Sequence, residues 1–168
     1  MRSKLLAVVM AVTAVVLGAC GASYGPYDVT VAPAPALRAS DQPYSVAVDL
    51  VGVNAANEGI WRRKRVSEYF SGQDELRAST AEDRVSFEFS QDDAAPKTLA
   101  RNHPVWQRWK KSGVVYLFVL SNQPGQDQPG DNDPRRLILD LSSEKWAGRD
   151  IQIEVLPGAG GFVVRGQR

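Results

Sequence analysis

Residues 114–120 are apolar at every position, Val-Val-Tyr-Leu-Phe-Val-Leu, and this run restricts the possible folds more than any other part of the chain. A strand with one solvent-facing side alternates apolar and polar residues, whereas a strand covered on both sides does not. The run therefore predicts a central strand, and we place it in the middle of the core.

Several further runs have the pattern of short strands. Residues 44–53 alternate in polarity, and Arg84–Ser90 alternates more cleanly, so each predicts a strand with one buried face. Residues 136–141, 150–156 and 161–164 are short β-rich runs separated by Pro and Gly. With six or seven strands expected and few helices, the sequence predicts an all-β fold, a two-sheet antiparallel β-sandwich with one or two short inserted helices.

Two segments have helical character. Residues 66–70 predict a short helix that either ends there or continues toward residue 77, and residues 104–111 predict another. In the second, Pro104 suits the first turn and Gly113 can terminate the helix. Trp106 and Trp109 share a face, which favours packing onto a sheet over the alternative of a carbohydrate platform or a partner anchor.

The N-terminus has the pattern of a secretory signal. Arg2 and Lys4 precede an apolar stretch at residues 5–17, and small residues lead to the only cysteine in Leu17-Gly18-Ala19-Cys20. The stretch is shorter than the roughly 20 apolar residues that span a bilayer. The string resembles a bacterial lipoprotein signal, which implies removal of residues 1–19 and attachment of a diacylglycerol to Cys20. Residue 21 is Gly and not Asp, which by the same resemblance implies the outer membrane, on its periplasmic side.

The remaining chain is divided into a tether and a domain. Residues 20–42 contain Gly25, Pro26, Pro33 and Pro35 with little apolar periodicity, so we expect a lipidated N-terminus and a flexible tether there. The alternative is that residues 29–31 pair as an edge strand. Residues 43–168 are expected to form the β-sandwich. Without residues 1–19 the chain carries 18 basic and 19 acidic side chains, which provides no electrostatic basis for a nucleic-acid partner.

The residues available for catalysis are few. His103 is the only histidine, and its position before Pro104 favours a cap or surface role. With Cys20 lipidated, no cysteine is left to act as a nucleophile, and a zinc site lacks its usual His and Cys ligands. We therefore expect no enzymatic activity, no metal and no cofactor apart from the covalent lipid on Cys20.

A basic run beside a tryptophan is the first candidate for binding. Four cations, residues 62–65, follow Trp61 in the loop expected after the first strand. Aromatic and arginine side chains dominate interface energetics, so an aromatic anchor with an arginine rim is expected here. The predicted partner-binding residues are Ile60, Trp61, Arg62, Arg63 and Arg65. Alternatives are binding of anionic lipid, or a solvated loop balanced by Glu58, Glu68, Asp74 and Glu75.

A second candidate is the loop at residues 123–134, which contains Asp127, Asp131 and Asp133. Its acidic residues are not in register with an EF-hand, so a solvated loop rich in turn-forming residues is favoured over a calcium site. Loops of this length on a small scaffold often carry binding function.

The chain resembles the outer-membrane lipoproteins of type VI secretion systems, the TssJ/SciN-like family. The resemblance rests on the lipobox, on Ser45-Val46-Ala47-Val48-Asp49-Leu50, on Ser67-Glu68-Tyr69-Phe70, and on residues 115–120 followed by Arg135-Arg136-Leu137-Ile138-Leu139. It implies a transthyretin-like sandwich and a non-catalytic docking role toward the periplasmic domain of an inner-membrane secretion component. The competing interpretation is an envelope lipoprotein that binds another ligand, such as a polysaccharide or an anionic envelope lipid.

Overall fold

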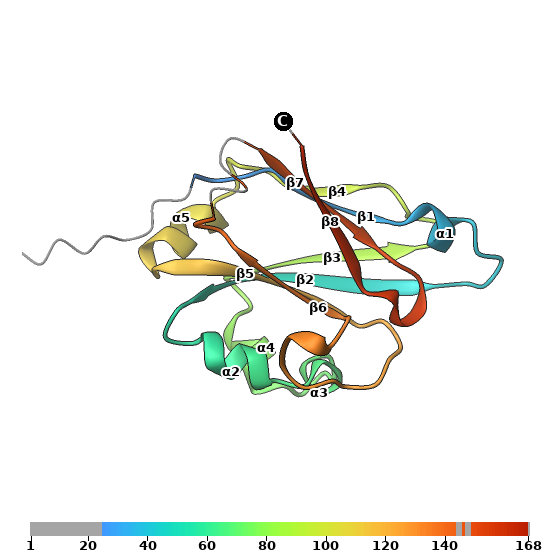
Figure 1. Cartoon of the computed structure of the whole chain (residues 1–168), viewed down its shortest axis with the longest axis horizontal. Helices are drawn as coiled ribbons and strands as arrows, with labels where there is room; N and C mark the ends of the chain where they lie inside the picture. The colour runs from blue at the N-terminus through green and yellow to red at the C-terminus, as the bar shows by residue number, and fades with distance from the viewer. Residues whose placement is uncertain (1–24, 144–145, 147–148, 168) are drawn as a thin grey trace, which may run out of the picture.

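The computed structural model describes residues 25–143, 146 and 149–167 of the chain, so Cys20 and the signal segment lie outside the described residues. Two four-stranded sheets pack face to face (Figure 1). The first sheet has the order β4-β1-β7-β8, and the second has the order β3-β2-β5-β6. The strands are β1 Val29–Pro33, β2 Ser45–Asn54, β3 Arg84–Ser90, β4 Lys97–Leu99, β5 Val114–Ser121, β6 Arg136–Asp140, β7 Asp150–Val155 and β8 Phe162–Gln167. The predicted two-sheet sandwich is confirmed, with one parallel pair, β1 with β7, among antiparallel ones.

Short helices occupy the connections between strands. They are α1 Pro35–Arg38, α2 Glu58–Arg63, α3 Val66–Tyr69, α4 Glu75–Ser79 and α5 Val105–Lys111, with 3-10 turns η1 Gly130–Asn132 and η3 Gly158–Gly160. In Figure 1, α2, α3 and α4 lie beneath the second sheet, on the face turned away from the first sheet. Among the described residues, no helix has the length and apolar character needed to cross a membrane.

The central strand is where the apolar run predicts it. In β5, Leu117 and Val119 face the core between the two sheets, while Phe118 and Leu120 face the helices on the other side. The prediction that residues 44–53 form a strand with one buried face is wrong, because β2, like β5, is covered on both sides. Its Val46, Val48 and Leu50 join the core between the sheets, and its Val51 and Val53 pack under the helices.

The prediction of a flexible tether at residues 20–42 is wrong for most of that range. Tyr27, Val29 and Val31 are buried in the core between the sheets, and β1 pairs with β4 on one side and β7 on the other. Nor is this segment the edge strand of the alternative, because it is an interior strand of its sheet. Its neighbours β4 and β7 are distant in the sequence, so local composition does not reveal the pairing. The folded domain therefore includes Tyr27 and β1 and does not begin at residue 43.

The helical predictions are partly confirmed. The helix expected at residues 104–111 is α5, and Gly113 ends it with φ +65°. Its Trp109 is buried with the indole lying over Gly52 of β2. The helix at residues 66–70 does not continue to residue 77, because Gly72 with φ +85° separates α3 from α4. The basic run falls partly on α2, where a loop was expected.

Candidate partner-binding surface

The three helices α2, α3 and α4 form what we call the helical layer, which has an apolar floor. Trp61 of α2 is 4% exposed, and its ring centroid lies 5.9 Å from that of Phe118 and 5.7 Å from that of Tyr69. These aromatic pairs, with Val66, bury the inner side of the layer on the second sheet. The expectation that Trp61 is an exposed anchor is therefore wrong. The side chain faces inward because α2 lies along the sheet and buries one of its sides.

A buried carboxylate attaches the helical layer to the second sheet. Asp49 of β2 is fully buried, and it accepts hydrogen bonds from Tyr69 Oη at 3.0 Å, Arg77 Nε at 2.9 Å and Ser86 Oγ at 2.6 Å. Arg84 Nε lies 3.4 Å from the same carboxylate. Burial, and then the charge of Asp49, raise the pKa of Tyr69 well above its usual value. Hydrogen bonding to Asp49 likewise raises the pKa of Arg77. A buried ion is stable only when it is paired and hydrogen-bonded in this way.

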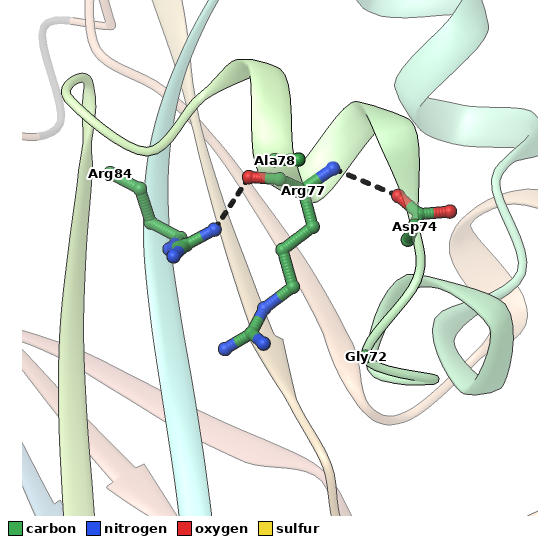
Figure 2. A pocket seen from close by; sticks show the side chains of 5 residues that line it. All are labelled: Gly72, Asp74, Arg77, Ala78 and Arg84. Atoms are coloured by element: carbon green, nitrogen blue, oxygen red, sulfur yellow. Dashed lines mark hydrogen bonds between the residues drawn. The ribbon is translucent and has the colours of Figure 1, made fainter.

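A small notch of about 120 Å³ lies between Gly72, Asp74, Arg77, Ala78 and Arg84. Figure 2 shows that its polar groups mostly bind one another. The Arg77 backbone N–H donates to Asp74 Oδ1 at 2.8 Å, which caps the start of α4, and Arg84 Nη1 donates to the Arg77 carbonyl at 2.6 Å. These hydrogen bonds position α4, and the Nε atoms of Arg77 and Arg84 lie 2.9 Å and 3.4 Å from the Asp49 carboxylate.

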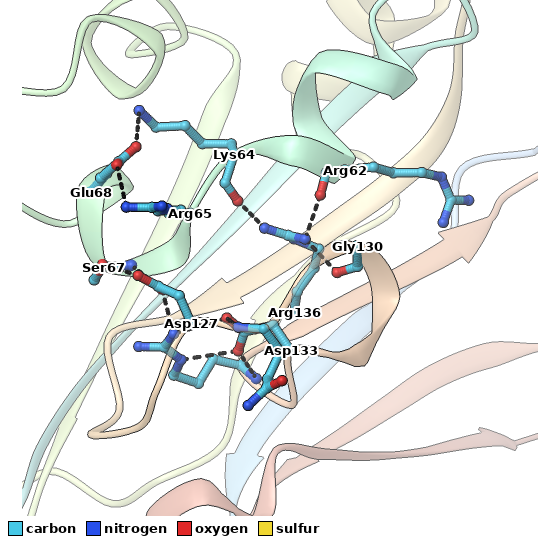
Figure 3. A network of polar contacts seen from close by, with 11 residues as sticks. Arg62, Lys64, Arg65, Ser67, Glu68, Asp127, Gly130, Asp133 and Arg136 are labelled. Atoms are coloured by element: carbon cyan, nitrogen blue, oxygen red, sulfur yellow. Dashed lines mark hydrogen bonds and ion pairs between the residues drawn. The ribbon is translucent and has the colours of Figure 1, made fainter.

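The C-terminal end of α2 and the first turn of α3 are bound to the loop at residues 122–135 (Figure 3). Arg62 pairs with Glu58 at 2.7 Å and with Asp131 of the loop. Arg136 is buried and donates to the carbonyls of Arg62 at 2.7 Å, Gly130 at 2.5 Å and Lys64. Burial lowers the pKa of Arg136. Arg136 therefore closes the carbonyl end of α2 against the loop.

Asp127 makes a second connection between the layer and the same loop. Its carboxylate accepts hydrogen bonds from the backbone N–H of Ser67 at 3.0 Å and from the Ser67 hydroxyl, and it pairs with Arg135 at 2.6 Å. Burial acts to raise its pKa, but the hydrogen bonds from Ser67 and then Arg135 outweigh burial and lower it to about 2. Arg135 also forms a two-pronged ion pair with buried Asp133.

These contacts correct two expectations. The loop at residues 123–134 is not simply solvated, because Asp127 and Asp133 are held by Arg135. The two candidate loops are also not separate surfaces, because the helical layer and this loop form one continuous region (Figure 3). Within the described ranges, no group of three or more His, Cys, Asp or Glu side chains is arranged to hold a metal ion.

The outer side of the helical layer is hollowed and partly apolar. Ile60 is 52% exposed and is the one large hydrophobic side chain so exposed in the part of the chain that the structure describes. It lines a hollow of about 560 Å³ together with Lys64, Glu68, Ser71, Gln73, Asp74, Glu75 and Leu76. We call this the acidic hollow, because three carboxylates and one ammonium line it. Lys64 forms an ion pair with Asp74 and lies 3.4 Å from Glu68, so carboxylates of the hollow itself neutralise its charge.

The five predicted partner-binding residues are thus divided by the structure. Ile60, Arg63 and Arg65 are exposed, Arg62 is bound to Glu58 and Asp131, and Trp61 is buried. The carboxylates proposed in the solvated-loop alternative do neutralise part of the run, through Glu58, Glu68 and Asp74. Sequence reasoning named Glu75 only as a balancing charge and missed Leu76 as a neighbour of Ile60. Both lie in the short segment after Gly72, which could have been read as a helix of its own.

His103 lies at the start of α5, as expected from its position before Pro104. The side chain is exposed, and its Nδ1 accepts a hydrogen bond from the Val105 backbone N–H at 3.2 Å. The residue thus satisfies a free donor of the first helical turn, as a cap does.

Comparison with known proteins reveals similarity to type VI secretion components. The TssM C-terminal domain from EAEC is 13% identical with a TM-score of 0.48, and the match covers 83% of this chain and 99% of that one. The lipoprotein TssJ1 from Pseudomonas aeruginosa is 15% identical with a TM-score of 0.44, covering 85% and 98% of the two chains. Lip from Serratia marcescens, described as a membrane-bound component of the type VI secretion system, is 14% identical with a TM-score of 0.43, covering 84% and 96%.

The chain resembles these proteins in fold. At 13–15% identity this similarity concerns the fold alone, and the sandwich itself is established by the order of the strands in the two sheets. No protein-family model matches the chain, and no curated protein matches it.

Proposed function

We propose that this chain is a lipid-anchored envelope protein that docks, without catalysis, onto the periplasmic domain of an inner-membrane component of a type VI secretion complex. The lipid on Cys20 would hold it in the outer membrane, facing the periplasm. The sequence Leu17-Gly18-Ala19-Cys20 supports the anchor, and the acidic hollow beside Ile60 supports the docking role.

The exposed Ile60 at the rim of the acidic hollow is the observation that carries the proposal. An aliphatic side chain that is half exposed beside a concave surface loses water-exposed apolar area when a partner covers it. Glu68 and Glu75 are exposed around it, and the carboxylates outnumber the single lysine. The chemistry of the hollow therefore fits a partner segment with an apolar side chain flanked by Lys or Arg.

The hollow is also firmly positioned. Asp49 binds α3 and α4 to the second sheet, and Arg136 and Asp127 bind α2 and α3 to the neighbouring loop. A surface held in one geometry loses little conformational entropy when a partner binds, which favours affinity.

Capture of the periplasmic domain of a type VI inner-membrane component tests the docking role. Ile60→Asp places a charge where the partner's apolar side chain would sit, so capture should fall at least tenfold with the melting temperature unchanged. The matched control is Ala36→Asp on α1, at the far end of the sandwich (Figure 1), which should leave capture intact. Equal capture by both variants and the parent would refute the proposal that the partner binds at the acidic hollow.

Charge reversal tests the acidic character of the same hollow. Glu75→Lys should weaken capture and reduce its dependence on salt, whereas Glu82→Lys, an exposed change outside the hollow, should not.

A separate experiment tests the lipid anchor. Cys20→Ser should move the folded protein from the membrane fraction to the soluble fraction. A Cys20→Ser protein that stays membrane-bound would contradict the lipid anchor.

A further inference from the structure

A buried residue of the domain, Tyr27, lies very close in the sequence to the residue that would carry the lipid. Tyr27 is already buried, with its hydroxyl donating to the Leu141 carbonyl at 2.9 Å. Only six residues, 21–26, separate it from Cys20. Because an extended chain spans at most about 3.6 Å per residue, Tyr27 cannot lie more than about 25 Å from Cys20, whatever conformation the connection adopts.

One end of the sandwich surrounds Tyr27. The Tyr27 ring contacts the Trp106 ring of α5 edge to face, with centroids 6.2 Å apart. The next residue, Asp28, accepts a hydrogen bond from the Arg101 backbone N–H at 2.6 Å. Figure 1 shows α5 at the same end of the molecule as the start of β1, with α1 at the opposite end. A lipid on Cys20 would therefore bring the α5 end, and not the α1 end, to the membrane.

This end carries exposed cations that have no ion pair within the described chain. Arg101 pairs with Asp28 at 3.1 Å and Asp150 at 2.7 Å, and Arg108 pairs with Asp83 at 2.9 Å, whereas the carboxylates of Glu82 and Asp140 have no ion pair with a described residue. Lys110 and Lys111 follow in the last turn of α5. Both are exposed, and neither has an ion pair with any described residue.

We infer that the α5 end of the sandwich lies against the bilayer, where Lys110 and Lys111 bind the phosphates of anionic lipid headgroups. This inference rests on the lipid anchor of the proposed function and adds an orientation to it. The lipid holds the α5 end within reach of the headgroups, and the two lysines then select one orientation by charge. The α1 end is directed away from the membrane, and the helical layer at the side of the sandwich remains accessible to a partner.

The experiment uses the full lipidated chain in phosphatidylglycerol vesicles that contain a headgroup-attached spin label. A fluorophore is placed on α5 through Gln107→Cys, and the matched control places it through Gln42→Cys near α1, both at exposed positions. Since the Cys20 thiol is consumed by the lipid, the dye reacts only with the introduced thiol. The dye on α5 should lose most of its fluorescence to the quencher, and the dye near α1 should keep its fluorescence.

The lysines are tested in the same assay. In the α5-labelled protein, Lys110→Gln and Lys111→Gln should each lower the ratio of docked to undocked molecules about fivefold, and raised salt should have the same effect. Arg38→Gln on α1 is the control, because Arg38 is also exposed and without an ion pair in the described chain, and it should change nothing.

The outcomes separate the two proposals. Mass spectrometry showing no lipid on Cys20 would remove the anchor and the inference with it. If the lipid is present, equal quenching at the two positions, stronger quenching near α1, or an α5 label shielded only when a protein partner is added would overturn the orientation and leave the anchor standing. Quenching at α5 that is insensitive to both lysines and to salt would overturn the headgroup contact.

Discussion

Removing the Asp49 carboxylate should destabilise the protein strongly, because this group joins the helical layer to the second sheet. Asp49 is completely buried and is bound by Tyr69, Arg77 and Ser86, with Arg84 nearby. Breaking a buried ion pair by deleting one partner costs about 3–5 kcal/mol. Arg77 and Arg84 are 29% and 17% exposed, so water can solvate them in part, and we expect Asp49→Ala to cost about 3 kcal/mol.

A double-mutant cycle with Arg77 isolates the interaction. Arg77→Ala leaves Asp49 with its other partners and should cost about 1.5 kcal/mol, the usual value of a hydrogen bond to a charged group. The double variant should cost less than the sum of the two single changes. The control is Asp93→Ala, which breaks the surface pair with Lys97 at 2.7 Å and should cost less than about 1 kcal/mol.

Urea unfolding measures these free energies, and hydrogen exchange locates the effect. Exchange should accelerate in α3 and α4 and change little in β7 and β8, which do not contact Asp49. Should Asp49→Ala prevent folding, Asp49→Asn keeps the shape and removes only the charge. A loss below about 1 kcal/mol for Asp49→Ala, or additive single changes, would refute the view that this carboxylate holds the layer in place.

Three further outcomes can be measured. Phe118→Ala should cost about 3–5 kcal/mol in a urea melt, since the ring is completely buried, and a change under about 1 kcal/mol would contradict the packing of β5. Gly52→Ala should cost about 1–3 kcal/mol, because a Cβ would lie 2.6 Å from the Trp109 ring, and an unchanged Tm would contradict that contact. Asp127 has a pKa of about 2 in the folded protein against an ordinary value of 3.8, so its stabilisation is present above about pH 4 and is lost as the pH falls toward 2. Asp127→Asn should remove this part of the acid unfolding profile, and an identical profile in the variant would show that the carboxylate contributes nothing.

Elements that depend on local patterns were predictable. The unbroken apolar run of β5 requires cover on both faces, and β3 alternates because one of its faces meets solvent. Pro104 and Gly113 mark the limits of α5 through backbone chemistry that acts within one or two residues. Each of these signals acts over a few residues, and this is why the two-sheet class could be inferred.

The burial of particular side chains depended on partners distant in the sequence. The sequence at Trp61 is compatible with either an exposed or a buried ring, and the outcome depends on Phe118 and Tyr69, which lie under α2. Asp49 sits in an alternating strand where a carboxylate suits solvent. It is buried because the helical layer covers that face and supplies Arg77 and Tyr69 as partners.

By itself, the sequence determined the secondary structure of the core strands, the two-layer class and the position of the candidate lipid site, because backbone preference and hydrophobic periodicity are local properties. Only the tertiary structure decided that β1 belongs to the first sheet, that Ile60 and not Trp61 meets solvent, and that the acidic hollow forms between helices on either side of Gly72. These features arise from pairing and packing between segments that are distant in the chain. The contacts that stabilise them join residues far apart in the sequence, so no local pattern of residues reveals them.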